Sequence, residues 1–342
     1  MATFLWTGWP LSVGLGGQFR WNRQFLHRVE EKLESDHGKS IRDCVDFYAG
    51  TSTGSIIALA LATTRLSMSA ISDLYDFNTA AKIFKENEGW FEIDGINAPK
   101  FEAEGKKSTL EENLGDATLN SAVLDNKHVL AVTYAIEKRK PVVIKSTDPT
   151  NLGLKSCDVA DASSAAPTYF PTREIEIPAG GDDYWLVDGG VIANNPTMCA
   201  IVEAKKVWSV PLSEIRVLSI GTGFLTKKIN GPQSKKWGGI QWMSKGHIMD
   251  LLSDERIVAY QAKEIIDQGK YIRVNASLKP QPGLPNAPDD AMDDVSRTNI
   301  KRLKELGDFW FQQYGNPAVG LLLDTYSGPS LDRIDHETGK PT

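Results

Sequence analysis

The sequence predicts an α/β fold, a three-layer α/β/α sandwich in which a mainly parallel sheet lies between two layers of helices. Strand-like runs alternate with helical stretches along most of the chain, as in parallel sheets joined by crossover helices. Two strand-like runs end in glycine-rich turns, GTSTG and DGG, which places both turns at one edge of the sheet. No break in composition divides residues 40–315. We therefore expect one domain over residues 1–315 and a polar C-terminal tail over residues 316–342.

The first half of the chain contains two strands and three helices by this pattern. Residues 1–19 carry no charge, are interrupted by glycine and proline, and lack a basic start and a cleavage site. They are therefore interpreted as a buried strand and a glycine loop rather than a secretory signal. Apolar residues at helical spacing predict an amphipathic helix over 22–35. Residues 44–49 predict a strand that leads through GTSTG into the apolar helix SIIALALA, and another helix is expected over 69–84.

The second half continues the alternation after a weakly patterned stretch. Asn195-Pro196 is a typical helix start, because a capping side chain precedes a proline in the first turn. Strands are expected over 128–136, 141–145, 184–187 and 215–220, and further helices over 246–267 and 295–314.

Composition excludes several classes of protein. The chain has 342 residues, of which 41% are hydrophobic and 24% charged, which is a globular balance. Its 38 basic and 44 acidic residues give a net charge of −6, which argues against nucleic acid as a partner. The scattered cysteines Cys44, Cys157 and Cys199 predict a reducing, cytoplasmic compartment, with neither a disulfide framework nor a zinc site. No apolar run has the length of about 18 residues that a membrane span requires.

The motif Gly50-Thr51-Ser52-Thr53-Gly54 carries the clearest chemical signal. It fits G-x-S-x-G, and it follows a strand and opens an apolar helix, as a nucleophile elbow does. Gly50 and Gly54 leave room for a turn that is too tight for a β-carbon beside the serine. Ser52 is therefore the predicted nucleophile, with the start of the following helix stabilising negative charge. The alternative is a strand–helix turn without chemistry.

A serine nucleophile needs a base, and histidine is the first candidate. Only His247 and His336 follow the serine late enough in the chain for the order found in α/β-hydrolases. His247 lies at an expected helix start, and His336 lies in the polar tail. Neither position favours a catalytic role over a capping or surface role.

Asp188 is the better candidate for the base. It ends an apolar strand and is followed by two glycines, so it lies on a turn at the same sheet edge as Ser52. A carboxylate whose pKa is raised toward 7 by partial burial can accept the serine proton directly. A turn-forming aspartate without chemistry is the alternative.

Three blocks together resemble the patatin-like phospholipases. They are GTSTG after a strand, ASSAAPTYFP at 162–171 and DGGVIANNP at 188–196, and LSIGTG at 218–223 is similar to the next strand of that family. The resemblance covers about residues 12–315 and implies a Ser–Asp dyad without histidine, formed by Ser52 and Asp188. It implies a lipid acyl hydrolase that cleaves phospholipid or galactolipid esters through an acyl-enzyme. It implies no cofactor and no metal.

The glycine loop near the N-terminus departs from the family pattern. The family has Asp-Gly-Gly-Gly-x-Arg/Lys-Gly, whereas this chain reads SVGLGGQFRW. Gly14, Gly16 and Gly17 could supply the oxyanion-hole amides, but no aspartate precedes them and no glycine follows Arg20. Because of this departure, a relative that binds lipid or protein without catalysis is one alternative. A Ser–His–Asp esterase that uses His247 is the other alternative.

The expected partners are membrane lipids, met at the bilayer surface by a peripheral protein. Nine tryptophans are many for this length, and Trp6, Trp9 and Trp21 cluster near the glycine loop. They are interpreted either as core residues or as an apolar rim that contacts lipid. Because the net charge is −6, any membrane contact should be hydrophobic or local.

Overall fold

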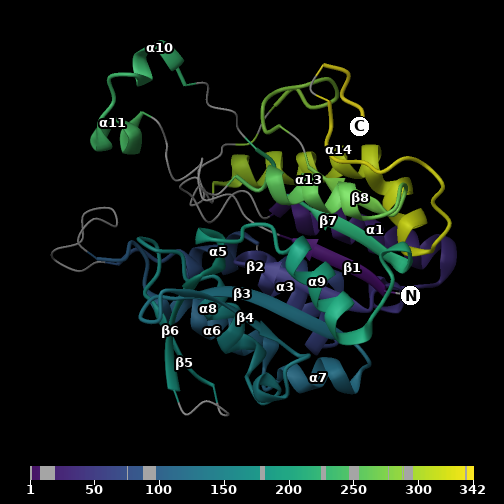
Figure 1. The fold of residues 1–342 in the computed structure, drawn as a ribbon. Coiled ribbons are helices and arrows are strands. Elements are labelled where there is room, and N and C mark those ends of the chain that lie inside the picture. The colour runs from purple at the N-terminus through teal and green to yellow at the C-terminus, as the bar shows by residue number, and fades with distance from the viewer. Residues whose placement is uncertain are drawn as a thin grey trace.

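The computed structural model contains one eight-stranded sheet (Figure 1). It describes residues 2–7, 20–74, 76–87, 98–177, 182–224, 229–245, 254–275, 277–286, 288, 296–335 and 337–342. The strands are β1 (Ala2–Thr7), β2 (Phe47–Thr51), β3 (His128–Ala135), β4 (Lys140–Lys145), β5 (Arg173–Ile177), β6 (Asp182–Asp188), β7 (Ile215–Ile220) and β8 (Tyr271–Val274). They follow the order β5-β6-β3-β2-β1-β7-β8, with β4 paired to β3.

Parallel pairing joins β3, β2, β1, β7 and β8, and antiparallel pairs add β4, β6 and β5. Strand β3 has three partners. Its residues 128–132 pair with β2, residues 133–135 pair with β6, and residues 130–135 pair with β4. Because β4 overlaps both other partners, β2 and β6 lie on the same side of β3 and meet end to end.

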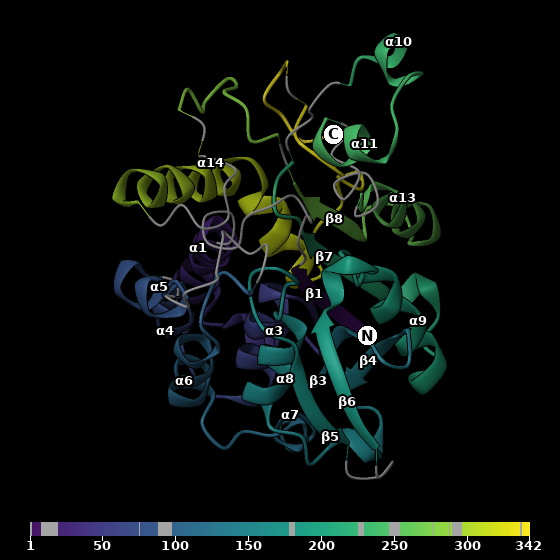
Figure 2. The same cartoon turned by 90° about the vertical axis from the view of Figure 1, so that its left-hand side faces the viewer.

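Helices cover both faces of this sheet. They are α1 (Arg20–His37), α2 (Ile41–Cys44), α3 (Thr53–Thr63), α4 (Met68–Asp73), α5 (Phe77–Ile83), α6 (Ala103–Leu114), α7 (Leu119–Leu124), α8 (Ser156–Ser163), α9 (Thr197–Trp208), α10 (Gly231–Ser234), α11 (Gly239–Ser244), α13 (Arg256–Ile265) and α14 (Arg297–Leu322). In Figure 2, α9 and α13 lie on one side of the sheet, and α1, α3, α8 and α14 lie on the other. The predicted three-layer α/β sandwich is confirmed.

Alternation along the strands divides the core between the two faces. Tyr48 of β2 packs into the larger apolar cluster with α1, α3, α8 and α14, whereas Phe47 and Ala49 pack into a smaller cluster with α9 and α13. This is the period of two that a strand imposes on its side chains. All five residues of β2 are buried, so the chain enters the turn at Ser52 from the middle of the core.

The predicted elements differ from the observed ones at several boundaries. The strand expected over 44–49 was placed too early, because Cys44 ends the short helix α2 and β2 begins at Phe47. The helix expected over 69–84 is two helices, since Asp76 caps a new start by accepting from the N–H of Thr79. Of the helix expected over 246–267, residues 246–253 lie outside the described residues, and α13 occupies Arg256–Ile265.

The C-terminal segment packs more closely than its polar composition suggests. Helix α14, expected over 295–314, continues to Leu322 and so crosses residue 315. Beyond it, Leu331 and Ile334 are buried, and Leu331 forms a bridge with Ile272 of β8. The described part of residues 316–342 therefore contributes side chains to the main core.

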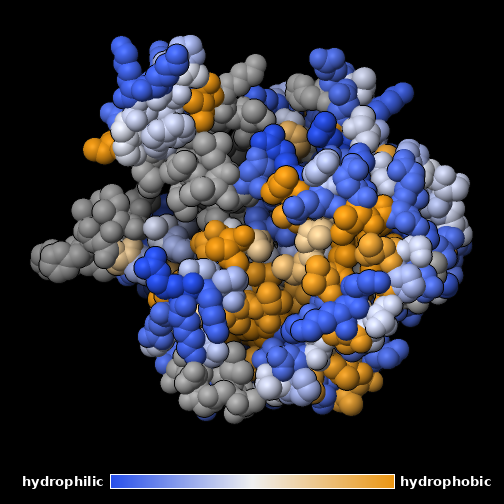
Figure 3. Space-filling view, in the orientation of Figure 1, coloured by the Kyte–Doolittle hydropathy of each residue, from blue (hydrophilic) through white to orange (hydrophobic). Residues whose placement is uncertain are grey.

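The surface carries apolar residues on the face seen in Figure 1. Figure 3 shows them gathered in the middle of that face, over α9 and the neighbouring strands. Val202 of α9 is 56% exposed and Ile192 is 45% exposed. Within the described residues, no helix is both long and apolar enough to cross a bilayer.

Candidate active site

Ser52 occupies a strained turn between β2 and α3. Its φ of 57° and ψ of −133° lie in a region of backbone angles that residues other than glycine rarely adopt. The turn is also tight at Gly50, where a β-carbon would lie 2.4 Å from the carbonyl oxygen of Gly54 and 2.4 Å from Cα of Ser55. The glycine at position 50 is therefore required by space, and the strain is concentrated on Ser52, the predicted nucleophile.

Four hydrogen bonds hold this turn in place. The N–H of Ser52 donates to Oγ of Ser163 over 3.1 Å, and Ser163 Oγ donates to the carbonyl of Val132 over 2.8 Å. Ser55 Oγ donates to the carbonyl of Ser52 over 2.5 Å. Thr51 Oγ1 donates to the carbonyl of Ala193 over 2.9 Å. The backbone of the elbow is thus fixed by α8, β3 and the segment after β6.

Asp188 ends β6 at the point where β6 meets β2. It pairs with Thr133 of β3, the residue after the partner of Thr51, so Ser52 and Asp188 approach each other along one side of β3. Its N–H donates to the carbonyl of Ala165 over 3.0 Å, and its Oδ1 accepts from the N–H of Gly190 over 2.7 Å. The structure therefore brings the two predicted site residues to one corner of the sheet.

Close backbone packing fixes the position of Asp188. A β-carbon on Gly189 would lie 2.2 Å from the carbonyl oxygen of Val132, so only glycine fits against β3 at that position. The first glycine of the DGG sequence thus lets the chain turn directly against the strand that also pairs with β2.

Burial gives the Asp188 carboxyl an unusual acidity. Asp188 is 1% exposed, and burial raises its pKa to about 7, although the Ser52 hydroxyl, the N–H of Gly190 and the Lys106 ammonium each lower it. A carboxylate with a pKa near neutrality is a stronger proton acceptor than an ordinary aspartate. It remains partly ionised at physiological pH.

The facing oxygens of Ser52 and Asp188 are not engaged elsewhere. Among the described residues, Ser52 Oγ and Asp188 Oδ2 are buried and neither forms a hydrogen bond of ordinary length, although the Ser52 hydroxyl lies near enough to the Asp188 carboxyl to lower its pKa. Buried polar atoms without partners are costly and are concentrated at functional sites. A hydroxyl at a strained turn beside a basic carboxylate is an arrangement suited to nucleophilic attack.

Several predicted residues lie outside the described part of the chain. These are Gly14, Gly16, Gly17, His247 and His336. Nothing in the geometry tests a role for them.

Three other histidines are described. His27 and His37 lie on α1, and His128 lies at the start of β3, where its ring packs against Trp208. Since β2 and β3 are parallel and His128 pairs with Phe47, its Cα is about 13 Å from the Ser52 end of the sheet at 3.3 Å per residue.

Sequence reasoning missed the residues that support this corner. Ser163 and Ala165 belong to the block ASSAAPTYFP, which was used only for the family resemblance, and Lys106 lies in a stretch without a clear pattern. Their contacts join segments that are distant in sequence: 111 positions separate Ser163 from Ser52, and Lys106 Nζ donates over 2.9 Å to the carbonyl of Ser164, 58 positions away. No local periodicity reports such contacts.

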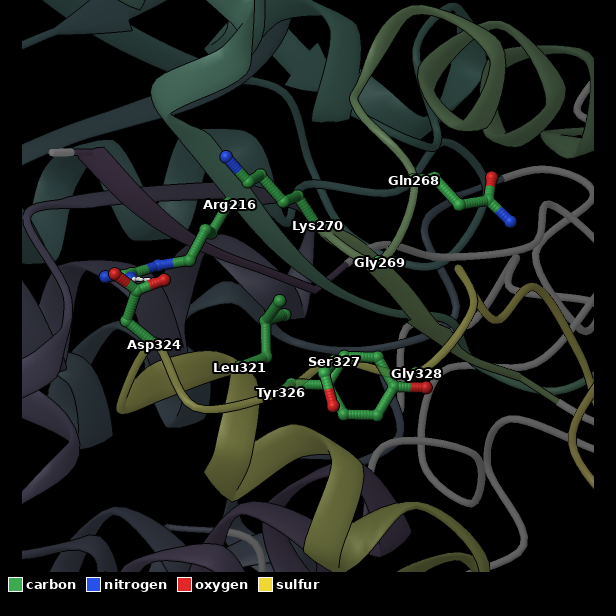
Figure 4. A pocket seen from close by; sticks show the side chains of 9 residues that line it. All are labelled: Arg216, Gln268, Gly269, Lys270, Leu321, Asp324, Tyr326, Ser327 and Gly328. Carbon is green, nitrogen blue, oxygen red and sulfur yellow. Dashed lines mark ion pairs between the residues drawn. The ribbon is translucent and has the colours of Figure 1, made fainter.

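A separate polar pocket lies at the opposite edge of the sheet (Figure 4). Arg216, Lys270 and Asp324 line it, and the Arg216 guanidinium pairs with the Asp324 carboxylate at 2.5 Å. Arg216 is near the start of β7 and Lys270 precedes β8, whereas Ser52 follows the end of β2. The pocket is therefore remote from the corner that holds Ser52. Among the described residues, no group of three or more His, Cys, Asp or Glu side chains could hold a metal ion.

The profile of the patatin-like phospholipase family matches residues 21–201, which is more than half of the chain. The chain belongs to the patatin-like phospholipase family. The match includes Ser52 and Asp188 and begins after the glycine segment that departs from the family pattern. Membership makes the chain a lipid acyl hydrolase, that is, a carboxylic ester hydrolase.

Relatives of the family resemble most of the chain. It is 27% identical over 332 residues to patatin-like protein 3 of Arabidopsis thaliana, covering 83% of this chain and 75% of that protein. It is 27% identical over 359 residues to patatin-like protein 2 of Oryza sativa subsp. indica, covering 92% of this chain and 81% of that protein. The crystal structure of VipD from Legionella pneumophila is similar in fold, with a TM-score of 0.50 and 11% identity over 95% of this chain and 67% of that one.

Proposed function

We propose that the chain hydrolyses carboxylic esters of membrane lipids through a dyad of Ser52 and Asp188. The observation that carries the proposal is the strained Ser52 turn beside a buried carboxyl whose Oδ2 has no partner in the described structure and whose pKa is raised to about 7. Family membership supports an ester of a lipid as substrate. Phospholipids and galactolipids are the proposed substrates.

The reaction follows from these two groups in two steps. Asp188 Oδ2 accepts the proton of the Ser52 hydroxyl while Ser52 Oγ attacks the ester carbonyl, and collapse of the adduct expels the alcohol, which takes that proton. Water, deprotonated in turn by Asp188, then attacks the acyl-enzyme, and the fatty acid leaves as Ser52 regains its proton. Both steps pass through an oxyanion, so N–H donors at the site must stabilise it.

Two sources of oxyanion donors are proposed. The first turn of α3 begins immediately after Ser52, and backbone N–H groups at the N-terminus of a helix favour a bound anion. The backbone N–H groups of Gly14, Gly16 and Gly17 are the second source, taken from the family resemblance. Removing one such donor from an enzyme costs about 10²–10³-fold in rate.

The decisive experiment combines a fluorophosphonate probe with turnover of a medium-chain p-nitrophenyl ester. We expect Ser52→Ala to lose labelling and turnover completely, and Asp188→Asn to lose about 10²–10⁴-fold in turnover. Wild-type activity should fall as pH drops below about 7, because protonated Asp188 cannot accept the serine proton. Ser156→Ala is the matched control, since Ser156 is a buried serine whose hydroxyl has no partner among the described residues.

Two results would contradict the dyad. Loss of labelling in His247→Ala would favour a Ser–His–Asp esterase. A folded wild type that binds lipid vesicles without labelling or acyl release would favour a binding protein. We expect neither, so His247→Ala should label and turn over like the wild type.

We also propose that the substrate is met at a lipid surface in a reducing, cytoplasmic environment. All three cysteines are free, which supports that compartment. Hydrolysis should rise when a phospholipid substrate passes from monomers to vesicles. Equal rates per accessible lipid in both forms would contradict the surface requirement.

A further inference from the structure

The end of α8 contacts the backbone of both proposed dyad residues. Ser163 Oγ accepts the N–H of Ser52 over 3.1 Å, and the carbonyl of Ala165 accepts the N–H of Asp188 over 3.0 Å. Two residues of one short segment thus hold the nucleophile and the base in register. Any displacement of this helix end would move both groups.

Lys106 of α6 closes that helix end from inside the protein. Its side chain is buried, and Nζ donates to the carbonyls of Asp161 and Ser164 over 3.0 and 2.9 Å and to Ser164 Oγ over 3.2 Å. The last carbonyls of a helix have no partner within the helix. Here the ammonium supplies one, and it also lies 4.4 Å from the centre of the Phe170 ring.

Charge around Lys106 comes from three other groups. Its Nζ lies 2.9 Å from Asp161 Oδ1, and Asp161 Oδ2 lies 2.5 Å from Nε of Arg173. Asp188 is the third charged group that acts on Lys106. Lys106 and Arg173 thus both contact the Asp161 carboxylate, and Asp158 also acts on Arg173.

The Lys106 charge acts on the carboxyl that the proposed mechanism uses. Burial lowers the pKa of Lys106, but the Asp161 carboxylate counters this effect by direct pairing. Within the described structure, Lys106 is the charged side chain that acts on Asp188, and it opposes the rise in pKa that burial causes. An amide could satisfy the same carbonyls, so the hydrogen bonds do not by themselves require a cation.

We infer that Lys106 is a positioning residue for the Ser52–Asp188 dyad, whose ammonium both fixes the end of α8 and favours the ionised form of Asp188. This inference rests on the proposed function. It assigns Lys106 two separable effects. The hydrogen bonds set the geometry of the dyad, and the charge sets the fraction of Asp188 that is ready to accept a proton.

The test compares Lys106→Met with Lys106→Gln and with Lys107→Met as a control. Gln keeps an N–H donor without the charge, and Lys107 is the adjacent residue on the same helix, 40% exposed and paired only to Glu111 in the described structure. The measurement is kcat/KM for the p-nitrophenyl ester from pH 5 to 9, with circular dichroism and urea unfolding to verify the fold.

Both Lys106 variants should move the acidic limb of the profile to higher pH by about half a unit or more, because the carboxylate has lost a nearby positive charge. Lys106→Met should also lower the plateau at high pH more than Lys106→Gln does. Lys107→Met should leave the limb where it is in the wild type. A residue that only supported the fold would change the plateau and not the position of the limb.

Opposite results overturn the inference in distinguishable ways. An unmoved limb in folded, active Lys106→Met and Lys106→Gln would overturn this inference alone. A folded wild type without labelling or turnover would overturn the proposed function, and this inference with it.

Discussion

Two buried charged corners lie at the same edge of the sheet and differ in how completely their charges are paired. The Ser52 corner contains Ser52, Asp188 and Lys106. The Arg273 corner contains Arg273 and Glu255. Both Glu255 oxygens are engaged, Oε1 with Arg273 Nη2 at 2.7 Å and Oε2 with Asn195 Nδ2 at 3.0 Å. In contrast, Asp188 Oδ2 has no partner among the described residues.

How completely the charges are paired in each corner affects the pKa values of its buried groups. Burial alone would lower the pKa of Arg273, but Glu255 together with Tyr271 and Asp332 outweighs it, and the pKa is raised. Burial raises the pKa of Asp188 toward neutrality, and no cation pairs with its carboxylate directly to offset that effect. A fully paired cluster makes the fold rigid, whereas an incomplete one retains reactivity at a cost in stability.

The largest expected effect is on the Arg273 corner. Arg273→Met should lower the free energy of unfolding by up to about 3–5 kcal/mol, because it leaves the Glu255 carboxylate, whose side chain is only 15% exposed, without its counter-charge. Urea unfolding at pH 7 measures the change. The control is Lys301→Met, whose side chain is 80% exposed and pairs only weakly with Glu305 at 3.8 Å, and it should change stability by less than about 1 kcal/mol. Equal effects of the two substitutions would remove the contrast between the corners.

Removing a charge from the Ser52 corner should have the opposite sign. The folded pKa of Asp188 is about 7 against an ordinary value of 3.8, so the folded state keeps a proton that the unfolded state loses between these values. The contribution of Asp188 to the free energy of unfolding is therefore fully present below about pH 4, and it is lost as pH rises toward 7 and above. Asp188→Asn should therefore be more stable than the wild type at pH 8, by up to about 4 kcal/mol, and nearly equal to it at pH 4.

Urea unfolding of both proteins at pH 4, 6 and 8 measures this difference. A variant less stable than the wild type at pH 8 would mean that Asp188 contributes to the fold as Glu255 does. The comparison between the corners would then fail.

The smallest effect is expected at the support of the elbow. Ser163→Ala removes the acceptor of the Ser52 N–H, so it should cost about 1–3 kcal/mol in stability and slow fluorophosphonate labelling several-fold. Ser156→Ala, on the same helix, removes a buried hydroxyl without a partner among the described residues and should change neither by a comparable amount. Labelling at the wild-type rate in folded Ser163→Ala would show that Ser163 does not position the elbow.

The parts of the site that local sequence encodes could be predicted. GTSTG after a strand indicated the turn at Ser52, and the end of an apolar run before DGG indicated Asp188. Both are strand ends, but they meet for a reason that the sequence did not show: β6 runs antiparallel to β3 and pairs with it just beyond the residues that pair with β2. The strained φ of Ser52 and the space left only for Gly50 are the physical content of those motifs.

Features that depend on distant contacts could not be predicted. Strand β8 and helices α6 and α7 carry no clear periodicity, and β8 is defined by parallel pairing with β7. In the sequence, Lys106 is one more charged residue on a polar helix. In the structure its ammonium is buried and donates to the carbonyl of Asp161, which is 55 positions away in sequence. Only the folded chain shows that this lysine faces inward.

The end-to-end meeting of β2 and β6 along β3 has a consequence for folding. The elbow is complete within a few residues, but its supports come from far along the chain, with 111 positions between Ser52 and Ser163 and 142 between Thr51 and Ala193. Contacts of such separation are slow to form, because closing a long loop costs entropy before the contact compensates for it. During synthesis Ser52 therefore emerges well before Asp188, and an incomplete chain would carry the serine without the rest of the proposed site. Reactivity at Ser52 would then appear only in molecules that have finished folding.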